Sequence, residues 1–130
     1  MTDKKPDCVY ALLVRDGRVF VRAIDGHFGL PGGVFRDMAE DRKVELRAHL
    51  WDQLGIDARS IWAQGAFQYR NPDEEREKFS GFYSVWEWDG DVHDAAGRWL
   101  NSDEIAMTAV PASLRILLFS VLQTQAVKTT

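Results

Sequence analysis

Three side chains on one predicted helix have the chemistry to hold a divalent metal ion. Glu45, His49 and Asp52 are spaced i, i+4 and i+7, so they project from one side of an α-helix. Carboxylate oxygens suit Mg²⁺ or Mn²⁺, whereas an imidazole is better suited to Zn²⁺ and other transition metals. The other interpretation is an ordinary solvated helix face, which is what rows of charged side chains usually form. The spacing predicts that the three side chains converge and leaves both interpretations open.

A glycine-rich loop precedes this helix and could bring its backbone close to a ligand. Residues 25–33 include four glycines and one proline, which allow backbone conformations that side chains would forbid. Phe28, Gly32 and Gly33 lie in this loop, and Arg22 lies on the strand just before it. Arg22 could bind a phosphate with its guanidinium, or it could be an ordinary exposed strand residue.

Apolar periodicity and turn residues predict the elements that would position these groups. The expected order is two strands joined by a tight turn, one long helix that ends at Gly55, a long hairpin, a short strand, a short helix capped by Asn101 or Ser102, and a terminal helix. The expected ranges are 8–15, 19–23, 37–54, 60–69, 79–88, 98–100, 102–107 and 112–125. This order favours an α/β domain with a mixed sheet between helices. Because no repeat or linker interrupts residues 1–130, we expect a single domain.

Two segments of the chain resemble the Nudix hydrolase family (MutT-like proteins). One is Phe28-Gly29-Leu30-Pro31-Gly32-Gly33, which precedes a long helix that ends at Gly55-Ile56, and the other is Arg98-Trp99-Leu100 before an acidic short helix. The resemblance implies a Nudix-type α-β-α sandwich. It also implies the family signature G-x5-E-x7-R-E-U-x-E-E-x-G-U, where U is aliphatic, whose glutamates hold a divalent metal against a diphosphate.

The signature is degenerate in this chain. When it is anchored on Gly55-Ile56, Glu40 takes the place of the first glutamate and the loop carries one extra residue. The other glutamate positions then fall on His49, Asp52 and Gln53, and the arginine position falls on Ala48. Anchoring on Gly33 instead keeps the arginine, as Arg47, but loses the first glutamate. Both registers leave few carboxylates, and we prefer the first because it keeps Glu40 and places the leucines inward.

The resemblance therefore implies a metal-dependent pyrophosphohydrolase of nucleoside diphosphate-linked compounds whose activity is altered or weak. The residues that it implies fall into three groups: Asp52, His49 and Glu40 for catalysis, Arg22, Phe28, Gly32 and Gly33 for substrate, and His49, Asp52 and Glu45 for Mg²⁺ or Mn²⁺. One alternative is a noncatalytic module that binds a nucleotide or another small ligand. Another is a structural or dimerisation domain, because aromatic residues lie on both faces of the strand expected at 79–88 and a homodimer would cover them.

Charge and composition narrow the partners. The formal net charge of -4 and the pI near 5.3 disfavour a nucleic acid polymer, since binding to a polyanion depends on basic side chains. The polar residues that precede the first strand have no apolar signal core, and no apolar run is long enough to span a membrane. We therefore expect a cytoplasmic protein with no membrane contact. Cys8, the single cysteine, is expected to serve packing.

Overall fold

The computed structural model describes residues 6–24, 27–35, 41–72, 74–92, 97–108 and 110–129. Glu40 and the rest of 36–40 lie outside the described residues, as do 25–26 and 93–96. The elements are β1 (Cys8–Arg15), β2 (Arg18–Ile24), β3 (His27–Gly29), β4 (Gly32–Val34), α1 (Arg42–Leu54), β5 (Asp57–Tyr69), β6 (Lys78–Asp89), β7 (Gly97–Leu100), α2 (Ser102–Ala106) and α3 (Ala112–Thr129).

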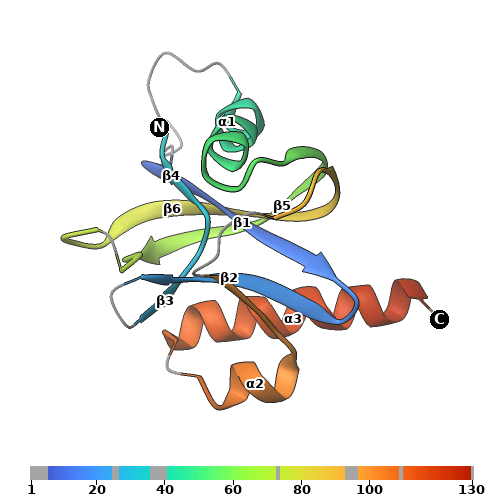
Figure 1. Cartoon of the computed structure of the whole chain (residues 1–130). Coiled ribbons are helices and arrows are strands. Elements are labelled where there is room, and N and C mark those ends of the chain that lie inside the picture. Colours follow the sequence, from blue (N-terminus) through green and yellow to red (C-terminus); the bar gives the residue numbers. More distant parts are fainter. Residues whose placement is uncertain are drawn as a thin grey trace.

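The strands form one mixed sheet with β1 at its centre. The order is β3-β2-β1-β6-β5, with β4 paired to β1 and β7 paired to β2 (Figure 1). β1 and β6 are parallel, and the other pairs are antiparallel. A parallel pair needs a long crossover connection, which here includes α1. The predicted mixed sheet is confirmed.

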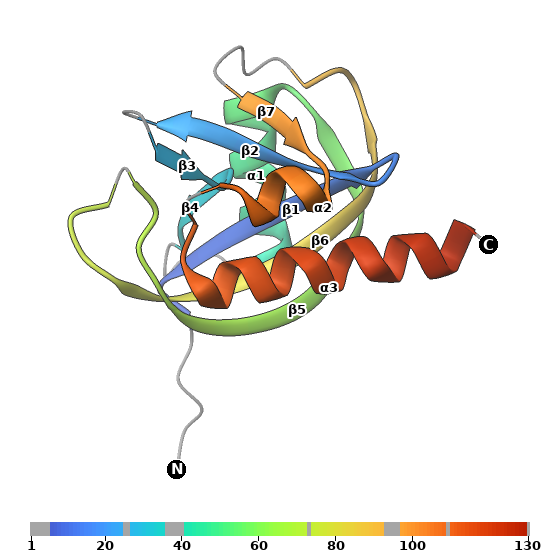
Figure 2. The same ribbon diagram turned by 90° about the horizontal axis from the view of Figure 1, so that it is seen from below.

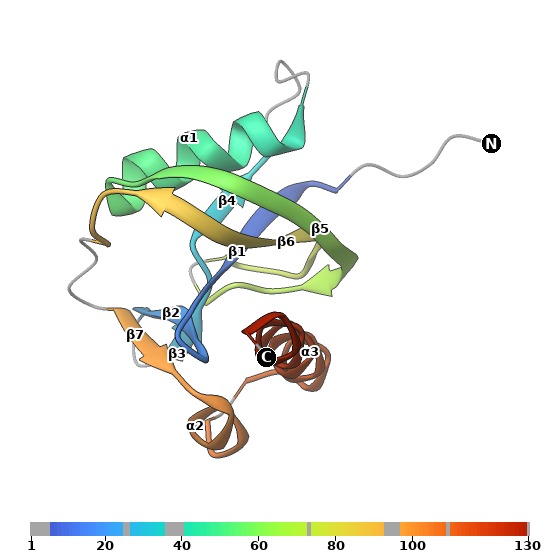
Figure 3. The same cartoon turned by 90° about the vertical axis from the view of Figure 1, so that its right-hand side faces the viewer.

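Helices cover both faces of this sheet because β1 is apolar on both sides. Cys8, Tyr10 and Leu12 belong to one buried cluster, which also includes residues of α2 and α3. Val9 and Leu13 alternate with them and belong to a second cluster, with the leucines of α1. Figure 3 shows α1 on one side of the strands and α2 and α3 on the other, and Figure 2 shows α3 lying along the sheet. The predicted α-β-α sandwich is therefore present.

Capping residues set the described ends of the helix that carries the site. The Asp41 side chain accepts a hydrogen bond from the backbone N–H of Lys43 at 2.8 Å, which satisfies one of the unpaired donors at a helix start. Gly55 ends the helix with a φ of 70°, a left-handed conformation that favours glycine. The predicted end of the helix is confirmed.

None of the helices among the described residues has both the length and the apolar character that crossing a membrane requires.

Candidate functional site

α1 turns two adjacent rows of side chains toward the protein. Leu46, Leu50 and Leu54 form an i, i+4, i+8 row that is fully buried in the core. The neighbouring row consists of Glu45, His49 and Gln53, and two of its members bond the short strand β4. Because each residue advances by 100° around a helix, a second row at the same spacing runs parallel to the first. The polar row is therefore a contact surface within the protein.

This arrangement corrects the helix face that apolar periodicity predicts. At 100° per residue, Val44 and Trp51 fall on the same broad face as the leucines, so the sequence predicts that they point inward, yet they are 60% and 62% exposed. Glu45 is expected on an acidic outer side, yet it is only 3% exposed. The physical reason is that hydrogen bonds and close packing against the loop favour burial of the polar row. Apolar periodicity indicates only where the apolar side chains lie.

Gln53 contacts the glycine loop through both ends of its side-chain amide. Its Oε1 accepts a hydrogen bond from the backbone N–H of Gly32 at 3.0 Å, and its Nε2 donates to the carbonyl oxygen of Gly32 at 2.7 Å. A guanidinium nitrogen of Arg22 lies 3.4 Å from the same Oε1. Gly32 has a φ of 137°, and a Cβ there would lie 2.1 Å from the carbonyl oxygen of Val9. Only glycine fits at the point where Gln53 holds the loop.

His49 makes the next contact with β4. Its Nε2 lies 2.9 Å from the carbonyl oxygen of Val34 and 3.8 Å from Oε1 of Glu45. A Cβ on Gly33 would come within 3.1 Å of Cε1 of His49, so the absence of a side chain at Gly33 lets the imidazole ring approach. Because the Nε2–O distance is a hydrogen-bond distance, the nitrogen is donating to a carbonyl and presents no lone pair to a metal.

A buried asparagine holds the other side of the glycine loop. Asn71 is 1% exposed, and its Oδ1 accepts hydrogen bonds from the N–H of Leu30 and the hydroxyl of Tyr69, both at 2.9 Å. Its Nδ2 donates to the carbonyl oxygen of Leu30 at 3.4 Å. A Cβ on Gly29 would lie 2.6 Å from Oδ1 of Asn71. Sequence reasoning missed Asn71, because an Asn-Pro pair between two strands signals a turn and not a long-range contact.

β1 presents neutral side chains behind this loop. Tyr10 pairs with Gly32 across β1 and β4, and Cys8 pairs with Val34. Burial raises the pKa of the Tyr10 phenol and of the Cys8 thiol above their ordinary values, because a buried charged form loses its hydration. Both groups therefore stay protonated at neutral pH, and Cys8 packs in the core as expected.

The predicted substrate-binding residues separate into two places. Arg22, Gly32 and Gly33 lie together around Gln53 and His49. Phe28 on β3 pairs with Ala23 on β2 and packs against the cluster under α3, on the opposite face of the sheet. Since neighbouring residues of a strand point to opposite faces, Arg22 and Phe28 do not share one binding surface. The structure places the candidate site between α1, β2 and β4.

The predicted metal ligands are not gathered into one group. Glu45 is buried and 3.8 Å from His49, whereas Asp52 is exposed on the surface of α1. No cluster of three or more His, Cys, Asp or Glu side chains suited to a metal occurs among the residues that the structure describes. Mg²⁺ and Mn²⁺ prefer several oxygen ligands, ideally with carboxylates. The donors along this side of α1 are an imidazole whose Nε2 is engaged, a neutral amide, one buried carboxylate and one separate exposed carboxylate, and this set does not fit such a metal.

Comparisons with known proteins add information about the fold. No family model matches the sequence, and the search of curated proteins finds no match. A crystal structure of a MutT NUDIX hydrolase from Burkholderia pseudomallei is similar, with a TM-score of 0.71 and 20% identity over 89% of this chain and 97% of that one. A MutT protein from Bacillus halodurans gives a TM-score of 0.73 and 16% identity, over 91% and 82% of the two chains.

A third similar structure is the NUDIX domain of Shewanella oneidensis NrtR complexed with ADP ribose. Its TM-score is 0.61 at 13% identity, and the match covers 95% of this chain and 87% of that one. At such low identities the similarity concerns the fold, and it agrees with the mixed sheet and the helices on both of its faces. This chain has the Nudix-type fold.

Proposed function

We propose that this chain is a noncatalytic binding module for a nucleotide-like ligand, of the nucleoside diphosphate-linked kind. The observation that carries the proposal is that the side chains of His49 and Gln53 bond the short strand β4. Both stand at positions where the resemblance implies metal-binding glutamates, and both instead bond the backbone of β4. At these two positions the helix offers no carboxylate to hold a metal against a diphosphate, and its side chains hold the loop in place instead.

The ligand class is supported by Arg22 and by one similar structure. The Arg22 guanidinium lies beside Gln53 at the edge of the glycine loop, and a guanidinium suits phosphate oxygens because its donors form a planar fork. The NUDIX domain of NrtR was solved with ADP ribose, a nucleoside diphosphate-linked compound. We propose that Arg22 contacts a phosphate of a ligand of this class.

An altered hydrolase is the second candidate, and the position of Asp52 favours it. Asp52 is exposed on α1, one turn from His49, so its carboxylate is accessible to a metal that a substrate delivers. In this candidate, weak turnover requires Mg²⁺ or Mn²⁺ and uses Asp52, His49 and Glu40, the last of which lies outside the described residues. The two candidates differ in one measurable property, which is metal-dependent cleavage.

We also propose the setting in which such a module acts. With a net charge of -4 the chain suits a small ligand better than a nucleic acid polymer. We propose that the protein acts in the cytoplasm, where nucleotide-like ligands occur. Trp62 on β5 is 57% exposed, and we propose a homodimer contact at this residue. Light scattering of the purified protein, compared with Trp62→Ser, tests the dimer.

Thermal shift and calorimetric titration with ADP ribose in the presence of EDTA test the binding proposal. A ligand that binds the folded state raises the melting temperature, so we expect a metal-independent rise that Arg22→Gln removes. Arg59→Gln is the matched control, because Arg59 lies on β5 and is paired with Asp89 at the surface. Product analysis with Mg²⁺, Mn²⁺ and Zn²⁺ should show no cleavage. Metal-dependent cleavage that Asp52→Asn abolishes would establish the hydrolase, and the absence of any thermal shift would refute the binding module.

A further inference from the structure

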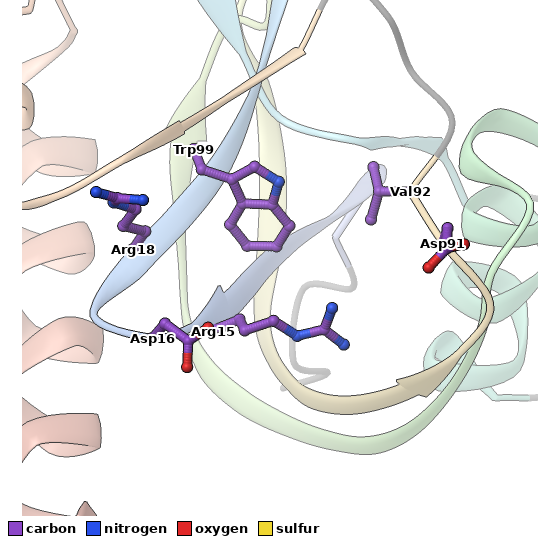
Figure 4. A pocket seen from close by; sticks show the side chains of 6 residues that line it. All are labelled: Arg15, Asp16, Arg18, Asp91, Val92 and Trp99. Carbon is purple, nitrogen blue, oxygen red and sulfur yellow. The ribbon is translucent and has the colours of Figure 1, made fainter.

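A pocket of about 370 Å³ lies away from the glycine loop, at the other end of β2. Its walls come from the β1–β2 turn, the segment after β6, and β7. The lining residues are Arg15, Asp16, Arg18, Asp91, Val92 and Trp99 (Figure 4). Arg18 and Arg22 are four residues apart on β2, which corresponds to about 13 Å along a strand. The pocket is therefore separate from the site around Arg22 and Gln53.

The aromatic wall of this pocket is held in place by other rings. Trp99 stacks on Trp88 with ring centroids 6.0 Å apart and an interplanar angle of 17°, and it meets Phe20 edge-on at 5.4 Å. The Arg15 guanidinium lies 4.0 Å from the centre of the Trp88 ring. A side chain that packing already orders loses little entropy when a ligand binds. Trp99 thus offers a preorganised flat surface.

Charged groups of both signs surround this ring. In Figure 4 Trp99 stands between Arg18 and Val92, and the Arg15 side chain extends across the pocket toward the side of Asp91. Arginine remains charged at any physiological pH, and its planar fork matches a carboxylate or a phosphate. The carboxylates of Asp16 and Asp91 can accept hydrogen bonds from hydroxyl or amino groups. Two cations beside an aromatic surface favour a ligand that is both flat and acidic.

We propose that this pocket binds a small ligand made of a planar aromatic ring and one acidic group. The ring stacks on Trp99, and the acidic group pairs with Arg15 and Arg18. The volume of about 370 Å³ falls at the lower end of the range of known small-molecule pockets. A nucleoside monophosphate and an aromatic carboxylate both have this chemistry, and the test distinguishes them. The proposal concerns different residues from the proposed function and does not depend on it.

The test is a titration followed by NMR signals of the tryptophan indole N–H groups, with the full chain in low-salt buffer. The probes are adenosine monophosphate, indole-3-carboxylate, and the controls adenosine and inorganic phosphate. We expect the Trp99 signal to move with at least one of the first two probes. Adenosine and inorganic phosphate should bind about tenfold more weakly, because adenosine lacks the acidic group and phosphate lacks the aromatic ring. Whichever probe binds identifies the source of the ligand. No movement of the Trp99 signal at millimolar concentrations of either probe overturns the proposal.

Variants assign the binding to this pocket. Arg18→Gln should weaken binding about tenfold, which is the loss expected for one charge-assisted contact. Arg98→Gln is the matched control, because Arg98 precedes Trp99 on β7 but lies over Phe28 on the other face. Trp99→Phe keeps an aromatic ring in the pocket and should retain part of the affinity. Because Arg18 is exposed, Arg18→Gln tests binding without altering the core. Equal losses in Arg18→Gln and Arg98→Gln, or a loss in Arg22→Gln alone, would overturn the assignment.

Discussion

The side-chain amide of Gln53 bonds both the N–H and the carbonyl oxygen of Gly32, at 3.0 Å and 2.7 Å. A planar side-chain amide can accept from one of these groups and donate to the other at the same time. A glutamate at this position could accept but not donate. The degenerate signature therefore has a structural use, in which α1 fixes the glycine loop without a metal.

Removing this amide should destabilise the protein. Gln53→Leu leaves two backbone groups of the buried Gly32 without their partner, and we expect a loss of about 1–3 kcal/mol in the free energy of unfolding. Urea denaturation followed by circular dichroism measures it. Gln123→Leu, on the exposed side of α3, is the control and should change stability by less than about 0.5 kcal/mol. Equal effects of the two substitutions would contradict the role of Gln53.

Gln53→Glu separates the two hydrogen bonds. The carboxylate still accepts from the Gly32 N–H and faces Arg22, but it cannot donate to the Gly32 carbonyl oxygen. We expect a smaller loss of stability than for Gln53→Leu, on the order of 1 kcal/mol. Because a carboxylate is now available beside the loop, calorimetry with Mn²⁺ should also detect stronger metal binding than in the wild type. Wild-type stability for Gln53→Glu would mean that the donated bond contributes nothing.

Asn71 should be as important to the loop as Gln53. Asn71→Ala removes the partner of the Leu30 N–H and carbonyl and of the Tyr69 hydroxyl, all at a buried position, so we expect a loss of about 2–4 kcal/mol. Tyr69→Phe removes only one of these bonds and should cost about 1 kcal/mol. Hydrogen exchange of the Leu30 amide provides the second measurement and should become faster in Asn71→Ala only. If the Leu30 amide stays equally protected, Asn71 does not hold the loop.

The elements were largely predictable from the sequence because their signals are local. The apolar run predicts the central strand β1, Gly55 predicts a helix end, and Asn101 or Ser102 is expected to cap the short helix. The structure confirms the strand and the helix end and shows Asn101 as the cap, with a capping box that includes Glu104. Each of these depends on neighbouring residues and on backbone preferences. The strands β3 and β4 were expected to be loop, since their pairing depends on distant residues of β1 and β2.

The site was less predictable because its side chains are positioned by long-range contacts. The helical spacing of Glu45, His49 and Asp52 indicates a shared side. It does not reveal that β4 lies against His49, that Glu45 is buried beside His49, or that Asp52 remains exposed. In the same way, the roles of Gln53 and Asn71 depend on contacts with residues 21 and 41 positions away. A polar row beside a leucine row at the same spacing is a usable signal for a buried polar contact surface.

Two glycines should respond differently to the same substitution. Gly32→Ala introduces a Cβ that would lie 2.1 Å from the Val9 carbonyl oxygen, at a φ of 137°, so β4 must move away from β1. We expect a loss of about 3 kcal/mol or more, or failure to fold. Gly17→Ala, at a φ of 72° with no atom within 4 Å of the new Cβ, should cost about 1 kcal/mol from backbone strain alone. Thermal unfolding of both variants checks the difference, and similar losses would contradict the close approach of β4 to β1.

Alkaline pH should destabilise the protein through its buried tyrosines. Burial raises the pKa of Tyr10 and of Tyr83 in the folded state, whereas a tyrosine in the unfolded chain titrates near its usual value of about 10. Below that value both states hold the proton and the stability is complete. Above it the unfolded state loses the proton first, so stability falls by about 1.4 kcal/mol per pH unit for each tyrosine until the folded pKa is reached.

Urea denaturation between about pH 9 and pH 11 should show this slope, and Tyr10→Phe should reduce it whatever its effect on stability at neutral pH. A slope that is the same in the wild type, in Tyr10→Phe and in Tyr83→Phe would show that these phenols do not control the alkaline limit.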